Sequence, residues 1–431
     1  MKSQKGCSEK IVEPVDPSVS VSAFKDPSFR WLWFASVSAQ TASAVGTVVI
    51  PLLAIQVLGL TSGTIALLAT AAACVALVVG FPSGMFAEFR KKRPILISAD
   101  CVRFGVFAAL GVFQFAGQLS LPVLLLAMCS NAAMQILFGS ASLAHTKDLV
   151  PSSLRADAVG KLQSAAWAAM IGGPIAAGML VAVIPIGVVM VSIALCFLGS
   201  AACIVCIRKP EGLPPRQATE ESKIRGLLAG IRFFACHRML RRLLVSWVLF
   251  AGAVAALTPV TQVFFLRDLD FTPEQYGIAM GVPSLAALLG SWIGGRVIGR
   301  IGVRRTILYG SVLRVPMYFI YPLLPSGNAG LIGAVTAFGA ILFLSSLVNA
   351  GLSTLRMDLI PDSLMSRTSS AWMMLTMVAG PILIPVAGFV MASSSPRIAL
   401  WVIGGIVALS AAVLPLRVLN RPDEEHHTEQ S

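Results

Sequence analysis

Two segments of the chain, 211 residues apart, share one pattern that decides the fold. Residues 84–103 read GMFAEFRKKRPILISADCVR, and residues 295–314 read GRVIGRIGVRRTILYGSVLR. Each begins at a glycine, passes through a group of basic residues and ends at an arginine inside an apolar stretch. Three more matches follow at nearly the same offset: KDLVPSSL at 147–154 with MDLIPDSL at 357–364, Gly173-Pro174 with Gly380-Pro381, and Pro51 with Pro259. The chain therefore consists of two copies of one unit.

The composition places both copies in a membrane. The chain has 431 residues, of which 56% are hydrophobic and only 12% are charged. Soluble domains average about 25% charged residues, so this chain carries too little charge to cover a water-exposed surface of its size. The same apolar content excludes a disordered chain. A polytopic membrane protein remains.

Twelve apolar runs are long enough to cross a membrane, which takes about 20 residues. Backbone groups must pair within lipid, so we expect each run to be a helix. Six spans in each copy leave both copies in the same orientation, which predicts an all-α fold of two parallel six-helix repeats. The predicted spans are 31–57, 63–87, 94–117, 120–143, 163–184, 186–207, 243–266, 274–298, 305–324, 328–352, 368–392 and 398–418.

The basic residues predict the orientation. Of 33 Lys and Arg residues, 29 lie in the tails and the loops of one side, two (Arg267 and Arg397) lie on the other side, and two (Arg103 and Arg314) lie within spans. Basic residues concentrate on the cytoplasmic side, so both termini should be cytoplasmic. The predicted parts are a tail at 1–30, a bundle at 31–208, a linker at 209–241 with a helix lying on membrane lipid, a bundle at 242–418 and a tail at 419–431.

Residues 84–103 resemble motif A of the major facilitator superfamily, and the twelve spans, the repeat and the long central linker are similar to that family too. Asp100-x-x-Arg103, the DLVP after span 4 and the Gly-Pro of span 5 resemble its efflux branch, which includes drug and macrolide exporters and enterobactin-type siderophore exporters. The resemblance implies the major facilitator fold and a monomeric secondary transporter in a bacterial cytoplasmic membrane, with no cofactor and no nucleic-acid partner.

The resemblance also implies gating residues. In the family, the motif A acid, here Glu88, binds the start of helix 11 near Thr368 and a basic partner, and so closes the cytoplasmic side. This sequence departs from the family, because Glu88 and Phe89 replace its Asp and Arg, and the second copy has Gly299 in place of the acid. The alternative is that these charges only set the topology. The gating or coupling residues are then Gly84, Glu88, Arg90, Arg93, Asp100, Arg103, Arg300, Arg304 and Arg314.

Charges inside spans are rare and usually functional. Asp100 lies one helical turn before Arg103, so the two could act in coupling or form an ion pair that joins helix 3 to its neighbours. In span 5, Gly173, Pro174 and Gly178 resemble the antiporter motif of the family, with Gly380 and Pro381 as their counterparts in span 11. Proline removes a helical hydrogen bond, so we expect a hinge at each site.

The family lines its substrate cavity with spans 1, 4, 7 and 10, and each of these spans carries polar residues on one face. The alternative is that hydroxyls bond their own helices and amides join neighbouring helices. We expect no acid near the middle of a span, hence a neutral, apolar cavity, which leaves Asp100 and Glu88 as candidate proton carriers. The predicted cavity residues are Gln40, Ser43, Thr47, Asn131, Gln135, Thr258, Gln262, Ser345 and Asn349.

The sequence therefore favours an antiporter of the multidrug-resistance type. It would export a small, largely apolar organic molecule (a drug, antibiotic, siderophore or other secondary metabolite) in exchange for protons. An uptake carrier or uniporter of the same fold is the nearest alternative. A non-transporting sensor or scaffold and a polytopic membrane enzyme are the alternatives of another class. An enzyme would need clustered His, Asp or Glu residues at the membrane surface, and neither these nor a metal-ligand spacing is found.

Overall fold

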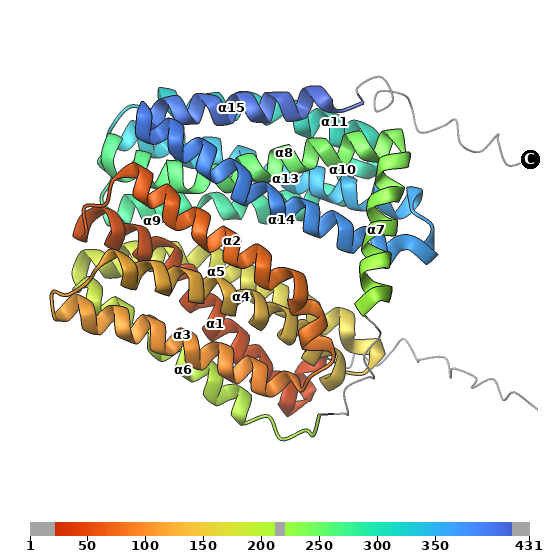
Figure 1. Cartoon of the computed structure of the whole chain (residues 1–431), viewed down its shortest axis with the longest axis horizontal. Coiled ribbons are helices and arrows are strands. Elements are labelled where there is room, and N and C mark those ends of the chain that lie inside the picture. Colours follow the sequence, from red (N-terminus) through yellow and green to blue (C-terminus); the bar gives the residue numbers. More distant parts are fainter. Residues whose placement is uncertain (1–21, 212–219, 416–431) are drawn as a thin grey trace, which may run out of the picture.

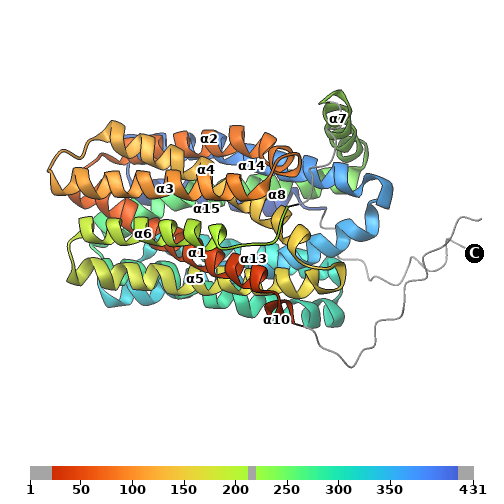
Figure 2. The same cartoon turned by 90° about the horizontal axis from the view of Figure 1, so that it is seen from below.

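The computed structural model describes residues 22–211 and 220–415, and every regular element within these two ranges is a helix. The N-terminal and C-terminal halves lie side by side, each as a group of roughly aligned helices (Figure 1). The halves are joined through α7 (Glu220–Cys236), which stands at one end of the bundle in both views (Figures 1 and 2). We call this the linker end and the opposite end the distal end.

The bounds of the helices agree with the predicted spans to within a few residues at most ends. The N-terminal half consists of η1 (Ala23–Lys25), α1 (Pro27–Leu52), η2 (Leu53–Val57), α2 (Ser62–Glu88), α3 (Lys92–Phe115), α4 (Leu121–Leu149), η3 (Ser152–Leu154), α5 (Arg155–Val183) and α6 (Ile186–Val205). The C-terminal half consists of α8 (Arg238–Val263), η4 (Phe264–Asp268), α9 (Pro273–Gly281), α10 (Pro283–Ile301), α11 (Val303–Leu313), α12 (Val315–Ile320), η5 (Tyr321–Leu323), α13 (Asn328–Leu359), α14 (Asp362–Ser393) and α15 (Pro396–Val413).

The structure divides two of the predicted spans. The eighth consists of α9 and α10, which meet at Val282 and together form one stretch of membrane length, and the ninth is divided further. Eleven segments of the described chain are long and apolar enough to cross a membrane as single stretches. The predicted span 305–324 is instead built from α11, α12 and η5, with the first break at Arg314. Pro316 follows this break, and proline neither donates a backbone hydrogen bond nor fits against the carbonyl four residues earlier. The twelve-span fold is retained, with interruptions in the eighth and ninth spans.

The two halves repeat each other down to single hydrogen bonds. The first helix of each half ends in a π-turn, η2 after α1 and η4 after α8. The Leu58 amide donates to the Leu53 carbonyl at 3.1 Å, and 211 residues later the Leu269 amide donates to the Phe264 carbonyl at 3.0 Å. Such π-turns are rare, so their recurrence supports the two parallel six-helix repeats that the sequence predicts.

Glycines hold the halves together toward the distal end. A Cβ atom on Gly277 of α9 would lie 2.4 Å from the Pro174 carbonyl oxygen of α5, and one on Gly281 would lie 2.5 Å from the Ile171 carbonyl oxygen. On the other seam, a Cβ on Gly388 of α14 would lie 2.3 Å from the Ala66 Cβ of α2. Small residues let membrane helices approach in this way, so both seams depend on backbone contact.

The linker is attached to both halves. On the N-terminal side, the Glu211 carboxylate accepts hydrogen bonds from the backbone amides of Lys92 (3.1 Å) and Arg93 (2.7 Å). An acid at a helix start is favourable, and this one caps α3. On the other side, the ring of the buried Phe234 in α7 lies 5.8 Å from that of Trp372 in α14. One face of α7 therefore packs on protein, and its contact with lipid stays a prediction.

Candidate functional site

A cavity of about 230 Å³ lies within the N-terminal half, between α1, α3 and α4. We call it the N-half cavity. It brings together three of the predicted substrate-cavity residues, Gln40, Ser43 and Gln135. Gln135 is 14 residues from each end of α4, or about 21 Å at 1.5 Å per residue, so the cavity lies at mid-depth. The other lining residues are Ala39, Arg103, Phe138 and Gly139.

A buried ion pair forms part of the wall of the N-half cavity. The Arg103 guanidinium donates to Asp100 Oδ1 at 2.6 Å, and the Ser200 hydroxyl of α6 donates to Asp100 Oδ2 at 2.5 Å. The side chains of Arg103 and Asp100 are 1% and 0% exposed. The rings of Phe138 and Phe197 lie 4.8 and 4.5 Å from the guanidinium carbon. The two charges balance each other, and the pair joins α3 to α6 as the structural alternative predicts.

The position of Asp100 corrects one expectation. We expected acids only in the first turns of spans, but Asp100 is the ninth of the 24 residues of α3 and is completely buried, in the third turn and still before the middle of the helix. The helix starts at Lys92, two residues before the predicted span, and Glu211 caps it there. The N-half cavity is therefore not purely apolar. It presents two amides and a paired guanidinium.

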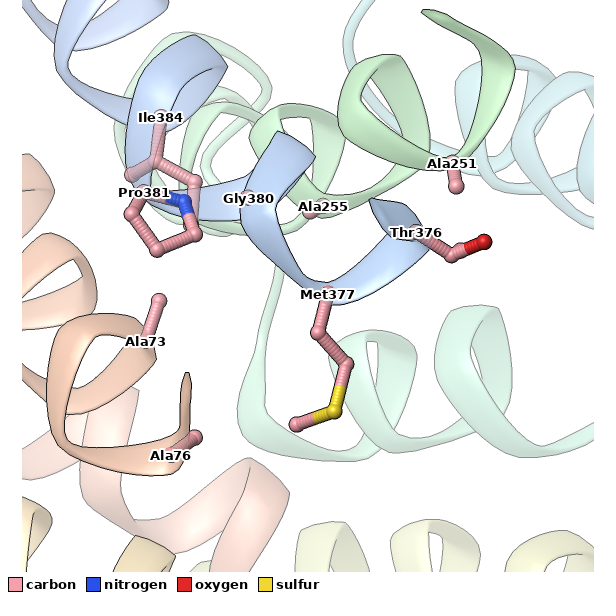
Figure 3. Close-up of a pocket in the computed structure, with 9 residues that line it drawn as sticks. All are labelled: Ala73, Ala76, Ala251, Ala255, Thr376, Met377, Gly380, Pro381 and Ile384. Atoms are coloured by element: carbon pink, nitrogen blue, oxygen red, sulfur yellow. The ribbon is translucent and has the colours of Figure 1, made fainter. Parts of the chain in front are cut away.

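A second cavity, of about 300 Å³, lies at the seam between the halves, where α2 meets α8 and α14. Figure 3 shows Ala73 and Ala76 of α2 on one side of it and Met377 and Pro381 of α14 on the other. Its one hydroxyl, from Thr376, donates to the Trp372 carbonyl of its own helix at 2.7 Å. The seam cavity is therefore apolar. Its remaining lining residues are Ala251, Ala255, Gly380 and Ile384.

Six of the predicted cavity residues line neither cavity: Thr47, Asn131, Thr258, Gln262, Ser345 and Asn349. Two of these hydroxyls bond their own helices, Thr47 to the Ala44 carbonyl at 2.7 Å and Thr258 to the Val254 carbonyl at 3.4 Å. This is the alternative that the sequence left open for hydroxyls. Asn131 Oδ1 and Ser345 Oγ are buried without a hydrogen-bond partner.

The predicted hinge residues are packing residues in the structure. A Cβ on Gly173 would lie 2.4 Å from the Ala44 Cβ, and one on Gly178 would lie 2.4 Å from the Pro273 carbonyl oxygen. Both α5 and α14 continue past Pro174 and Pro381, and a hinge there stays a prediction. The glycines of α9 were missed, although Gly277-x-x-x-Gly281 is a recognisable helix-packing motif.

The gating residues are only partly described. The structure describes neither the side chain of Glu88 nor the burial of Gly84, so the predicted contact of Glu88 is not tested. The predicted site of that contact needs correcting, because α14 begins at Asp362 and not near Thr368. Thr368 is buried, and its hydroxyl donates to the Leu364 carbonyl at 2.9 Å.

The other arginines of the predicted gating set have different surroundings. Arg93 donates to the Val205 carbonyl of its own half at 3.2 Å, whereas Arg300 is exposed. Arg90 and Arg304 both have interaction partners. Arg314 is 1% exposed.

Among the residues that the structure describes, no group of three or more His, Cys, Asp and Glu is placed to hold a metal ion.

The family follows from the sequence profile that the chain matches. The profile of the Major Facilitator Superfamily matches residues 32–383 and 256–431, which together cover nearly the whole chain. The chain belongs to the major facilitator superfamily. No curated protein sequence matches it.

Several solved transporters of differing substrates share the fold of this superfamily member. A bacterial homologue of the iron transporter ferroportin in its inward-facing state aligns with a TM-score of 0.72 and 15% identity over 93% of this chain and 100% of that chain. Its outward-facing state gives 0.59 and 14% identity over 90% and 98%. A bacterial homologue of the lysosomal transporter Spinster gives 0.70 and 14% identity over 90% and 96%. These likenesses establish the fold.

Proposed function

We propose that the chain is a secondary active transporter that exports a small, amphipathic and largely apolar organic molecule by alternating access. The observation that carries the proposal is the pair of cavities at mid-depth, one inside the N-terminal half and one at the seam between the halves. Transporters of this kind bind their substrate near the bilayer midplane and move one half against the other.

The chemistry of the two cavities supports an amphipathic substrate. The seam cavity offers alanine, proline, isoleucine and methionine surfaces, which suit an apolar body. The N-half cavity offers the amides of Gln40 and Gln135, which can donate to and accept from a polar group. Ligand sites typically combine a mainly apolar surface with a few placed polar groups.

Contacts between the halves support a state that is closed at the distal end. The Arg267 guanidinium of the C-terminal half donates to the Leu60 carbonyl of the N-terminal half, and the contact of Gly178 with Pro273 lies at the same end. The higher similarity to the inward-facing than to the outward-facing ferroportin homologue agrees with this state. With the 29 basic residues on the cytoplasmic side, the linker end and both termini face the cytoplasm of a bacterial cell, and the protein acts as a monomer.

Coupling to proton entry is assigned to Asp100. It is the one acid in the buried set of the described residues, and it lies in the wall of the N-half cavity through its partner Arg103. A proton on Asp100 would remove the charge that holds the guanidinium and leave Arg103 free to bond a group in the cavity. The release of that proton would restore the pair, so that occupation of the cavity and protonation are linked.

The test uses the purified protein in liposomes, with the neutral amphipathic fluorophore N-phenyl-1-naphthylamine as the probe. A proton gradient of either sign is imposed, and movement of the probe is followed by fluorescence. We expect the probe to move in the direction opposite to the flow of protons. This movement should be lost in Asp100→Asn and should change little in Asp268→Asn, which removes an acid at the distal end. Gradient-independent movement would identify a uniporter, and co-directional movement would identify an uptake carrier.

A further inference from the structure

The C-terminal half contains a buried arginine without an acid. Arg314 is 1% exposed, and its Nε and Nη1 atoms have no hydrogen-bond partner. No carboxylate of a described residue forms an ion pair with it. Its guanidinium lies over the ring of Phe250, whose centroid is 3.4 Å from the guanidinium carbon. That contact covers a face of the guanidinium and leaves donors on its edge unsatisfied.

The internal repeat shows which group is missing. Arg103 and Arg314 occupy equivalent positions, 211 residues apart, and at this offset Asp100 corresponds to Ser311. Ser200, which donates to Asp100 in the N-terminal half, has Ser410 near the equivalent position, at an offset of 210. The Ser410 hydroxyl donates instead to the Val407 carbonyl of its own helix at 2.7 Å. The C-terminal half has thus kept the cation and lost the anion that balances it.

The depth of Arg314 makes this imbalance costly. Arg314 lies 11 residues after the start of α11 at Val303, or about 16 Å along a helix, which is near the middle of a hydrocarbon core about 30 Å thick. An unpaired charge buried there costs far more than one aromatic contact returns. A guanidinium stays charged in proteins, so it cannot escape the cost by losing its proton.

We propose that Arg314 binds a small monovalent anion, supplied in solution as chloride. Tyr318 offers a second ligand, because its hydroxyl is also buried without a partner and lies one helical turn after Arg314. Arg314 is itself the interruption between α11 and α12, and Tyr318 lies in the first turns of α12. Discontinuous membrane helices commonly form ion sites. Arg314 is only 1% exposed and lines neither cavity described above, so the site suits a monatomic ion better than a carboxylate carried by an organic substrate.

The experiment measures the thermal stability of the purified full-length protein while chloride replaces gluconate at constant pH and ionic strength. An anion that binds only the folded state stabilises it by RT ln(1 + [L]/Kd). Chloride at one hundred times its Kd therefore raises the ratio of folded to unfolded protein about 100-fold. We expect a saturable rise in the melting temperature of the unmodified protein and none in Arg314→Gln. Crystals soaked in bromide should show anomalous density beside the guanidinium.

The internal repeat suggests a second variant that should lose chloride binding but still fold. Ser311→Asp places a carboxylate where the N-terminal half has Asp100, so it should fold with its own internal anion and lose the chloride dependence. The matched control is Arg296→Gln, which removes an arginine that lies over the Trp292 ring outside this site and should keep the dependence. Equal chloride dependence in the unmodified protein and Ser311→Asp would overturn the proposal, as would no dependence in the unmodified protein. Gluconate is itself a carboxylate, so equal melting temperatures in chloride and in gluconate would contradict a monatomic ion even if both anions stabilised the protein.

Discussion

Replacing Gly277 by alanine should open the distal end of the transporter. In the structure, the new Cβ would lie 2.4 Å from the Pro174 carbonyl oxygen and 3.1 Å from the Gly178 Cα. All of these atoms belong to backbone, so the contact cannot be relieved by a side-chain rotation. Overpacking of this kind costs about 1–3 kcal/mol. The clash exists only while α5 and α9 are in contact, so the cost falls on the state that is closed distally.

Alanine also favours a helix over glycine by about 0.5–1 kcal/mol, but it does so in either state, so this gain does not change the balance between the two states. The matched control checks that a glycine-to-alanine change without a clash leaves that balance unchanged. Gly172→Ala changes a glycine of α5 whose added Cβ would meet nothing within 4 Å. A difference of 1–2 kcal/mol between the variants corresponds to about a 5- to 30-fold shift between the closed and open states.

The assay is a distance measurement between spin labels at the distal ends of the two halves, at Gln118 and Ser326, in a background without the natural cysteines. We expect a longer-distance population to grow in Gly277→Ala and to stay unchanged in Gly172→Ala. The reasoning fails if the two variants give the same distance distribution, because the glycine contact would then not hold the distal end closed.

Three further predictions concern the ion pair, the cavity and the topology. Asp100→Asn leaves a buried guanidinium without its counter-charge and should destabilise the protein by about 3–5 kcal/mol; a melting temperature equal to that of the unmodified chain would contradict the buried pair. Gln135→Leu should weaken binding of the amphipathic probe at least several-fold, measured by fluorescence titration, whereas Gln262→Leu, which lines neither cavity, should leave it unchanged. A cysteine at Asp268 should react with an impermeant reagent outside intact cells and one at Lys92 should not, and the reverse pattern would invert the proposed orientation.

The membrane architecture could be predicted because it depends on features that are local in the sequence. Span length, the side on which basic residues gather and the 211-residue repeat each follow from the bilayer as a solvent, and they give the twelve helices and their parallel halves. The sequence did not predict the break in the ninth span, because Arg314 and Pro316 lie in a run whose average hydropathy is that of an uninterrupted membrane span. Averages over a window hide one interruption.

The details of the site depend on contacts between residues far apart in the chain, which sequence patterns do not predict. Helical spacing placed Asp100 beside Arg103, and the structure has this contact. The partner Ser200 lies 100 residues away on α6, and no local pattern selects it from the other serines. The polar residues of spans 7 and 10 resembled those of spans 1 and 4, but whether a side chain faces a cavity is decided by helix rotation, which the sequence leaves open.

The attachments of the linker have a consequence for how the motion of the two halves can be followed. Glu211 is tied to the start of α3, whereas α7 is tied to α14 through Phe234. In the proposed alternating-access cycle the two anchor points travel with different halves, and the chain that joins them connects two moving bodies. The distance between a pair of fluorophores placed beside these anchors should therefore change during each transport cycle. A rigid cross-link between them should stop turnover while leaving each six-helix bundle intact.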